Sequence, residues 1–172
     1  MVKRHIKPNS RVLDIGCHDG LLVKLLSERK SATGVGVDPD HLPKTSVAGF
    51  QLINARFPEC LPLLSGPFDA VCALAVLEHV DRSLQRDFVR AIRSLLTPNG
   101  QVVLSIPSAA VDPILAILMK LRILDGMEPE QHFGFKIAEV QPLFESEGFQ
   151  LRHHRRFQLG LNHIFVFAPK LV

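Results

Sequence analysis

Short apolar runs and amphipathic stretches alternate along the first two thirds of the chain. The apolar runs have the length of β-strands and cover residues 11–15, 33–40, 50–55, 67–76 and 101–107. The run PFDAVCALAV at 67–76 is apolar on both faces, which is typical of a parallel strand covered by helices on two sides. The second run is broken at Asp38-Pro39, because proline cannot continue the hydrogen-bonding ladder of a sheet.

The amphipathic stretches repeat their apolar residues at helical spacing. Leucine recurs at 21, 22, 25 and 26, which predicts a helix over 21–28. The clearest helix is expected over 82–100, where Pro98-Asn99-Gly100 ends a stripe made of Leu84, Phe88, Ile92, Leu95 and Leu96. Two more helices are expected, one at 114–124 that is apolar on nearly every side and one at 137–148 that Pro142 interrupts or delays.

Two strands, 149–158 and 163–169, close the chain and are joined by LGLN. The alternation of strands and helices before them predicts an α/β fold, a doubly wound, mostly parallel seven-stranded sheet with right-handed crossovers. The closing pair is expected to form an antiparallel hairpin at one edge. A length of 172 residues suits a single domain over 1–172. In such sheets ligands bind at the carboxyl ends of the strands.

Composition and charge narrow the function classes. The net charge of +3 is too small to indicate a nucleic-acid partner. Cys17, Cys60 and Cys72 have neither C-x-x-C nor metal-ligand spacing, so we expect reduced thiols, a cytoplasmic protein and no metal site. No signal peptide is recognisable, and the longest apolar run, 114–119, is too short for a transmembrane segment.

Candidate chemistry begins where the first strand ends, in VLDIGCHDG at 12–20. Gly16 lets the backbone turn sharply and lets a ligand approach the main chain. Gly20 allows tight packing where the next helix presents free N–H groups and the positive end of its dipole. A site for a nucleotide-like ligand and a loop without a ligand fit this pattern equally well.

The spacing of the next features narrows the choice of nucleotide. The dinucleotide fingerprint G-x-G-x-x-G requires glycine where this chain has His18, which counts against NAD. Asp38 lies 22 residues after Gly16, where a carboxylate can accept hydrogen bonds from two ribose hydroxyl groups. The alternative is that Asp38 only caps the turn at Pro39.

A third feature, FDAVCALAVLEHV at 68–80, makes a family resemblance plain. The chain resembles the class I S-adenosylmethionine-dependent methyltransferases of the small-molecule type. DIGCHDG is similar to their first motif, D-x-G-C-G-x-G, and GVDPD to the segment with the ribose-binding acid. LLTPNGQVVLSIP and EVQPLFESEGFQL resemble the later turn, strand and helix segments, so the resemblance covers nearly the whole chain in the right order.

The resemblance implies S-adenosyl-L-methionine as the cofactor. The residues it implies as contacts are Asp14, Gly16, Cys17, His18 and Gly20 around the methionine part, Asp38 at the ribose, Pro39, Ala55, Arg56 and Phe57 around the adenine, and Leu74 near the sulfonium. Two positions depart from the family pattern. His18 replaces a glycine, so its side chain must point away from the cofactor or narrow the pocket. Arg56 and Phe57 stand where many relatives have an adenine-binding Asp, so stacking or backbone contacts would hold the adenine.

The expected methyl acceptor is a small molecule. His79 could accept its proton as a catalytic base, or Glu78 and His79 could only begin the next helix. His132 in EQHFGF could contact the acceptor, or it could lie in a loop anchored by Phe133. The segment 108–136 is expected to form a lid. Its apolar stretch at 114–124 could cover an apolar acceptor, contact a membrane or a partner, or only pack on the sheet. Because the chain starts almost at the first strand, we expect an open site or one completed by the second subunit of a homodimer.

Two other functions compete with methyl transfer. A methyltransferase-fold binding module with weakened cofactor affinity would explain His18 and the missing adenine-binding Asp. A nicotinamide-dependent oxidoreductase fits the glycine spacing poorly. The basic cluster RHHRR at 152–156 alternates between the two faces of a strand, so a solvated edge is favoured over a phosphate-bearing partner.

Overall fold

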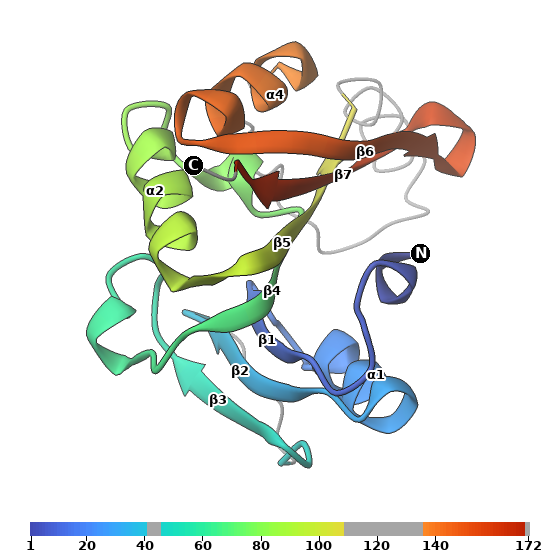
Figure 1. Ribbon diagram of the computed structural model, residues 1–172, viewed down its shortest axis with the longest axis vertical. Coiled ribbons are helices and arrows are strands. Elements are labelled where there is room, and N and C mark those ends of the chain that lie inside the picture. Colours follow the sequence, from blue (N-terminus) through green and yellow to red (C-terminus); the bar gives the residue numbers. More distant parts are fainter. Residues whose placement is uncertain (41–45, 109–135, 171–172) are drawn as a thin grey trace, which may run out of the picture.

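The computed structural model describes residues 1–40, 46–108 and 136–170. In this part of the chain the strands form one mixed sheet in the order β3-β2-β1-β4-β5-β7-β6 (Figure 1). Its strands are β1 (Arg11–Ile15), β2 (Thr33–Asp38), β3 (Phe50–Asn54), β4 (Phe68–Leu74), β5 (Leu96–Pro107), β6 (Phe149–Phe157) and β7 (Asn162–Pro169). The first five run parallel, whereas β7 is antiparallel to both β5 and β6. The predicted sheet with its antiparallel edge hairpin is therefore confirmed.

Helices cover both faces of this sheet. On one face, α1 (Leu21–Lys30) buries Val23 and Leu26 in a cluster with residues of β1, β4, β5 and β7. On the other face, α2 (Gln85–Leu95) and α4 (Ile137–Ser146) contribute Phe88, Ile92 and Phe144 to the larger cluster (Figure 1). Cover on both sides explains why β4 is apolar on both faces.

Phenylalanine rings fill the core beneath α4. The ring of Phe144 stacks on Phe167 with centroids 4.2 Å apart and meets Phe149 edge-on at 5.5 Å. Phe165 continues the row along β7, with its ring parallel to that of Phe167. This row of parallel rings runs from the buried centre toward the edge where β7 begins.

The predicted helix over 82–100 was wrong at both ends. The Asp81 carboxylate accepts the Ser83 N–H at 2.8 Å, which holds a turn that delays the helix to Gln85 and leaves Leu84 56% exposed. The helix ends at Leu95, and Leu96 is already extended. Thr97 cannot easily continue the helix, because a proline disfavours the α conformation of the residue before it. Residues 97–100 then form an irregularity in β5, between the pairs Phe68↔Leu96 and Ala70↔Gln101.

Helix α4 runs without interruption through Pro142, because fully buried Val140 and Phe144 on either side hold it against the sheet. The expected helix 114–124 and residues 109–135 of the predicted lid lie outside the described residues. Within the described ranges, no helix has the length and apolar composition that crossing a membrane requires.

Removal of the Phe144 ring tests this core. Phe144→Ala is expected to lower the free energy of unfolding by about 3–5 kcal/mol, because the ring is fully buried against two others. The matched control, Leu159→Ala, removes a fully exposed side chain and should change it by less than about 0.5 kcal/mol. Urea unfolding measures both, and similar losses in the two variants would contradict the packing of α4.

Candidate active site

The ends of β1 and β2 meet at the carboxyl edge of the sheet. Gly16 and Cys17 donate their backbone N–H groups to the Val37 carbonyl at 2.8 and 3.1 Å. One residue further, the His18 N–H donates to Asp38 Oδ2 at 2.9 Å. Three hydrogen bonds therefore hold the glycine-containing loop against the tip of β2.

The Asp38 carboxylate organises this junction. It is 8% exposed, and while Oδ2 receives the His18 N–H, Oδ1 accepts the Asp40 N–H at 3.0 Å. Asp38 thus caps the turn at Pro39, which was one of its two expected roles. A carboxylate can accept about four hydrogen bonds, so capping the turn and binding the hydroxyl groups of a ligand are compatible roles.

Gly16 allows the loop to approach the chain that follows β4. Its φ is +73°, a left-handed value, and a Cβ at this position would lie 2.6 Å from the Cγ2 atom of Val76. Both the backbone conformation and the lack of space therefore exclude a side chain here. The loop, the tip of β2 and the segment after β4 converge on one region of the edge.

His18 keeps its imidazole out of this region. Its φ of +44° is left-handed, which explains why a glycine suits this position in the motif that the loop resembles. The side chain is 65% exposed and lies 4.0 Å from the Asp19 carboxylate. Of the two outcomes expected for His18, the structure shows the one in which the side chain turns to solvent.

A buried acid and two thiols lie beneath the loop on the α1 face. Asp14 is 3% exposed, and burial, followed by the charge of Asp38, raises its pKa to about 8. Burial and then Asp14 raise the pKa of Cys17 to about 12, and the same causes raise that of Cys72. The thiols are therefore protonated and unreactive at neutral pH, and a cation bound here would favour ionisation of Asp14.

The end of β4 forms the next part of the edge. Leu74, at its last position, is partly buried, and Ala75 follows with a left-handed φ of +54° while donating its N–H to the Ser105 carbonyl. A 3-10 turn, Leu77–His79, then buries Glu78 and exposes His79. Glu78 and His79 therefore precede α2 and do not begin it.

The residues after β3 separate into two groups. Ala55 donates its N–H to the Asp38 carbonyl at 3.2 Å, and the Asn54 amide donates to the Pro39 carbonyl at 3.1 Å, so both adjoin the tip of β2. Phe57 is turned into the core, where its ring meets Phe88 edge-on at 5.1 Å. Arg56 is exposed.

The structure thus brings together most of the predicted site. The predicted site residues that lie at the shared edge are Asp14, Gly16, Cys17, Gly20, Asp38, Pro39, Ala55 and Leu74, together with the backbone of His18. Phe57 is separated from them by its place in the core, and His132 lies outside the described residues. Sequence reasoning missed Val76 and Ala75, because neither residue type signals a close approach or a left-handed backbone.

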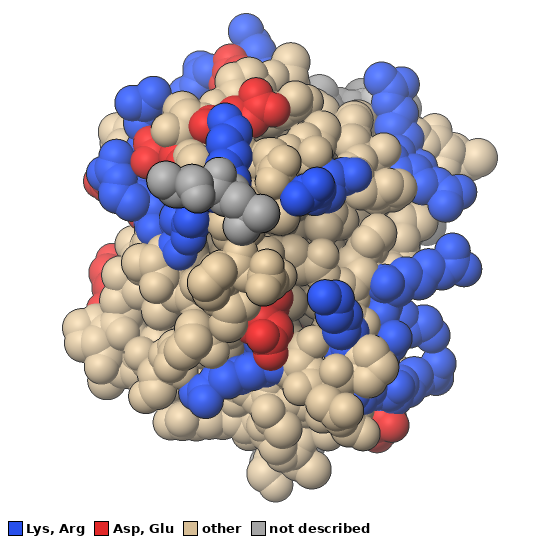
Figure 2. All heavy atoms as spheres, in the orientation of Figure 1, with Lys and Arg blue, Asp and Glu red and all other residues tan. Residues whose placement is uncertain are grey.

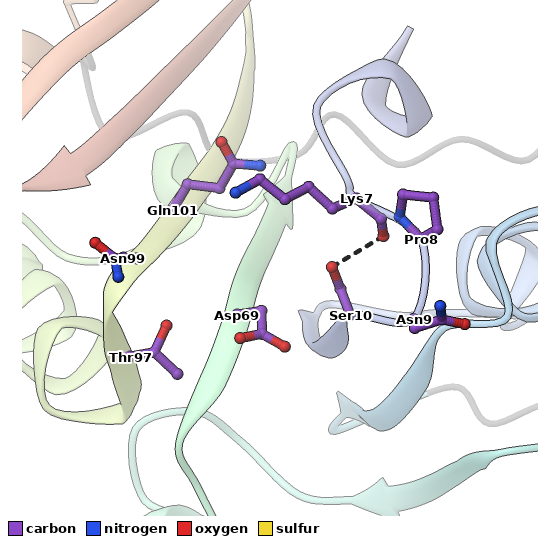
Figure 3. Close-up of a pocket in the computed structure, with 8 residues that line it drawn as sticks. All are labelled: Lys7, Pro8, Asn9, Ser10, Asp69, Thr97, Asn99 and Gln101. Carbon is purple, nitrogen blue, oxygen red and sulfur yellow. Dashed lines mark hydrogen bonds between the residues drawn. The ribbon is translucent and has the colours of Figure 1, made fainter.

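A pocket of about 290 Å³ lies at the opposite edge of the sheet (Figure 3). It is lined by polar side chains near the amino ends of the strands, including Lys7, Ser10, Asp69 and Gln101. Because ligands of open α/β sheets bind beyond the carboxyl ends, this pocket is not the candidate site. Among the described residues, no three His, Cys, Asp or Glu side chains are grouped so that they could hold a metal ion.

Comparison with known proteins identifies the family of this chain. A family model described as a methyltransferase domain matches residues 2–154. The chain belongs to this methyltransferase-domain family. The ubiquinone biosynthesis O-methyltransferase of Pseudomonas aeruginosa strain PAO1 is 33% identical over 106 residues, which cover 55% of this chain and 43% of that protein. The chain spans less than half the length of the curated relatives it matches.

Solved structures show the same fold at low identity. The magnesium protoporphyrin IX methyltransferase of Synechocystis, solved with bound SAH, has a TM-score of 0.68 and 19% identity, covering 98% of this chain and 78% of that one. The 1,6-didemethyltoxoflavin-N1-methyltransferase of Burkholderia thailandensis has a TM-score of 0.70 and 18% identity, covering 96% and 72%.

Two alanine substitutions separate the causes that favour glycine at position 16. Gly16→Ala is expected to lower the free energy of unfolding by about 2–4 kcal/mol, from its left-handed φ and from the contact with Val76. Gly160→Ala has a φ of +88° and open space around the new methyl group, so about 1–2 kcal/mol is expected. Equal losses in urea unfolding would show that the approach to Val76 is not tight.

The raised pKa of Asp14 predicts a pH dependence. Between pH about 4 and 8 the folded protein binds this proton and the unfolded chain does not, so the free energy of unfolding falls as pH rises. The slope from this group reaches at most about 1.4 kcal/mol per pH unit. Asp14→Asn cannot titrate and should gain stability relative to wild type as pH rises from 5 to 8. The control Asp81→Asn, at an exposed position, should show the same change in the free energy of unfolding with pH as wild type. If the curve of Asp14→Asn also runs parallel to that of wild type, the raised pKa of Asp14 is contradicted.

Proposed function

We propose that this chain is an S-adenosyl-L-methionine-dependent methyltransferase domain that methylates a hydroxyl group of a small molecule. The observation that carries the proposal is the junction between the Gly16 loop and the Asp38 carboxylate at the carboxyl edge. Membership of the methyltransferase-domain family supports the reaction class. The names of the curated relatives, which are O-methyltransferases, support oxygen as the accepting atom.

The residues at the junction fit the cofactor. Gly16 gives the loop its left-handed bend against Val76, and Asp38 offers a carboxylate suited to ribose hydroxyl groups. Asp38 supplies a negative charge for the cationic sulfonium and amino groups, and a cation bound there would favour ionisation of Asp14, whose pKa is raised by burial and by Asp38. Gly16, Cys17 and Gly20 would shape the pocket around the methionine part. When bound, the cofactor supplies the methyl group and a neutral sulfur leaving group.

The adenine would be held without the Phe57 ring. Since Phe57 packs against Phe88 in the core, Pro39 and Ala55 beside the tip of β2 are the better candidates for flanking the base. Exposed Arg56 is available for contact from the solvent side. Leu74, at the end of β4, would border the methyl group that is transferred.

The acceptor side is less complete within the described residues. His79 is exposed on the turn after β4 and stays a candidate for proton transfer, and His132 stays a prediction. The lid over 108–136, the single domain over 1–172, the homodimer and the cytoplasmic location also stay predictions. The binding-module alternative loses one of its two reasons, because the His18 imidazole faces solvent.

Calorimetric titration with S-adenosylmethionine and S-adenosylhomocysteine tests the cofactor site. Asp38→Asn and Asp38→Ala are expected to weaken both ligands about 10- to 100-fold, because a hydrogen bond to a charged group contributes about 1.5–3 kcal/mol. Asp69→Asn is the matched control, since Asp69 also accepts a backbone N–H, from Arg11, but at the amino edge. Circular dichroism checks that each variant is folded. Equal affinity of Asp38→Asn and wild type would remove Asp38 from the site, and no binding by wild type would overturn the proposed function.

A further inference from the structure

The hairpin of β6 and β7 carries two hydrogen-bonded imidazoles. His154 Nε2 and His163 Nδ1 lie 2.9 Å apart, with the two rings 15° from parallel. The His154 ring also stacks on Phe165, with centroids 4.1 Å apart and the planes within 4°. The pair therefore ends the row of parallel rings that begins at Phe144, and this packing fixes its position.

The register of the sheet places this pair at the carboxyl edge. Leu74, the last residue of β4, pairs with Ser105 of β5, which pairs with Ile164 of β7. His163 pairs with Ile106, one position further toward the edge. Neighbouring strands are about 4.8 Å apart, so His163 lies two strands, or roughly 10 Å, from the end of β4. An acceptor of ordinary size bound over the edge spans that distance.

The pair also connects a protected position with solvent. His163 is 5% exposed, whereas His154 is exposed. A hydrogen bond between two imidazoles needs a protonated nitrogen on one ring and a bare nitrogen on the other. Two neutral rings bonded in this way form a chain along which a proton can move from the inner ring to the outer one.

We propose that the pair takes up the proton of the acceptor's hydroxyl group during methyl transfer, an inference that rests on the proposed function. His163 Nε2 accepts the proton, the Nδ1 proton of His163 passes to His154 Nε2, and the proton on His154 Nδ1 leaves to water. The acceptor oxygen forms its bond to the methyl carbon as the carbon–sulfur bond breaks, and that bonding pair stays on sulfur. One proton is released for each methyl group transferred.

The surroundings of the pair favour release of the proton over its retention. Burial lowers the pKa of His154, with smaller effects from Arg156 and His153. Burial also lowers the pKa of His163, with smaller effects from His154 and Arg156. The residue of β5 that pairs with His163 is apolar Ile106. Both rings are therefore neutral at pH 7 and pass a proton on to water.

Arg156 adds a fixed positive charge beside the pair. It lies directly opposite His163 in the antiparallel register, so the two side chains are on the same face of the hairpin. Figure 2 shows Lys and Arg side chains on the right of the view, beside the hairpin turn and the N-terminal segment, as well as on the upper left. In strand β6, Arg152, Arg155 and Arg156 are exposed. A guanidinium next to the imidazoles stabilises the oxyanion that forms as the hydroxyl proton leaves.

A hydroxyl group lies close to the same turn. Ser108 follows β5 and donates its N–H to the Leu161 carbonyl at 2.8 Å, two residues before His163. Its Oγ is buried and has no hydrogen-bond partner among the described residues. Since a buried hydroxyl without a partner is costly, its position is consistent with a polar group of a ligand at this edge.

The test uses 4-nitrophenol, whose ionised form absorbs visible light, as a probe for the acceptor. In the full chain saturated with S-adenosylhomocysteine, the pH at which half of the bound probe is ionised should fall by about one unit, a tenfold change in the equilibrium. Arg156→Gln should abolish most of this shift, because the shift comes from the fixed positive charge. His154→Gln should leave the shift in place, because both rings are neutral before and after the proton leaves, but it should slow methylation of the probe by S-adenosylmethionine about 100-fold. An unchanged rate in His154→Gln would overturn the relay. Arg155→Gln is the matched control, since it removes the same charge from the opposite face of the same strand, where its partner is Ile164.

Each other result overturns the inference. It fails if wild type leaves the absorbance of the probe unchanged, or if Arg155→Gln removes the shift as fully as Arg156→Gln. His163→Asn, checked by circular dichroism, should behave like His154→Gln, and exposed His154 keeps the test decisive if the buried variant does not fold. Calorimetry with S-adenosylhomocysteine in the same samples separates the two proposals. Cofactor binding without a shift defeats only the relay, whereas absence of cofactor binding defeats the proposed function and the relay with it.

Discussion

The hydrogen bond from the His18 N–H to the Asp38 carboxylate is the interaction on which the candidate site depends. It holds a loop whose residues 16, 18 and 20 all have left-handed φ values, of +73°, +44° and +75°. A left-handed conformation costs a residue with a side chain about 1–2 kcal/mol. A hydrogen bond to a charged group contributes about 1.5–3 kcal/mol, enough to offset that cost at His18. The same hydrogen bond also fixes the direction of the Asp38 carboxylate. One interaction therefore sets both the conformation of the loop and the position of the carboxylate that is proposed to bind the ribose.

Buried Asp14 at this edge lowers the free energy of unfolding at neutral pH when no ligand is bound. Asp14 is held at a pKa of about 8 by burial and by the charge of Asp38, so its ionised form is disfavoured where it stands. Natural sequences keep such an arrangement mainly at functional sites, where a bound cation compensates for it. Asp69 at the amino edge shows the contrast, because it is exposed and lies at the edge where such sheets do not bind ligands.

Sequence patterns predicted the parallel strands, the edge hairpin and the meeting of Gly16 and Asp38 at one end of the sheet, because these follow from hydrophobic period and from strand order. They did not predict that Phe57 packs on Phe88, because an aromatic residue after a strand fits the core and the ligand side equally well. The end of the helix at Leu95 was missed because apolar Leu96 continues the helical stripe while it pairs with Phe68 in the sheet. The approach of Val76 to Gly16 depends on tertiary structure that no local pattern encodes.

The histidine pair illustrates why such a site escapes sequence analysis. Leu151 faces the core under α4, and strict alternation would put His153 and Arg155 on that same face. An irregularity in the register between Leu151 and His153 shifts the pattern by one residue, so His154 stacks on Phe165 and reaches His163.

Strand direction supplies the other half of the arrangement. Because β7 runs antiparallel to β5, its second residue, His163, lies at the carboxyl edge, whereas a parallel last strand would carry it to the amino edge. The parallel half of the sheet thus presents Gly16 and Asp38, and the antiparallel half presents the imidazoles and Arg156, on either side of the ends of β4 and β5. In the proposed reaction the small molecule that receives the methyl group would lie between these two halves. The cofactor would approach it from the parallel half, and the imidazoles that take its proton would approach it from the antiparallel half. Such a separation is compatible with an in-line displacement, in which the hydroxyl oxygen reaches the methyl carbon from the side opposite the sulfur.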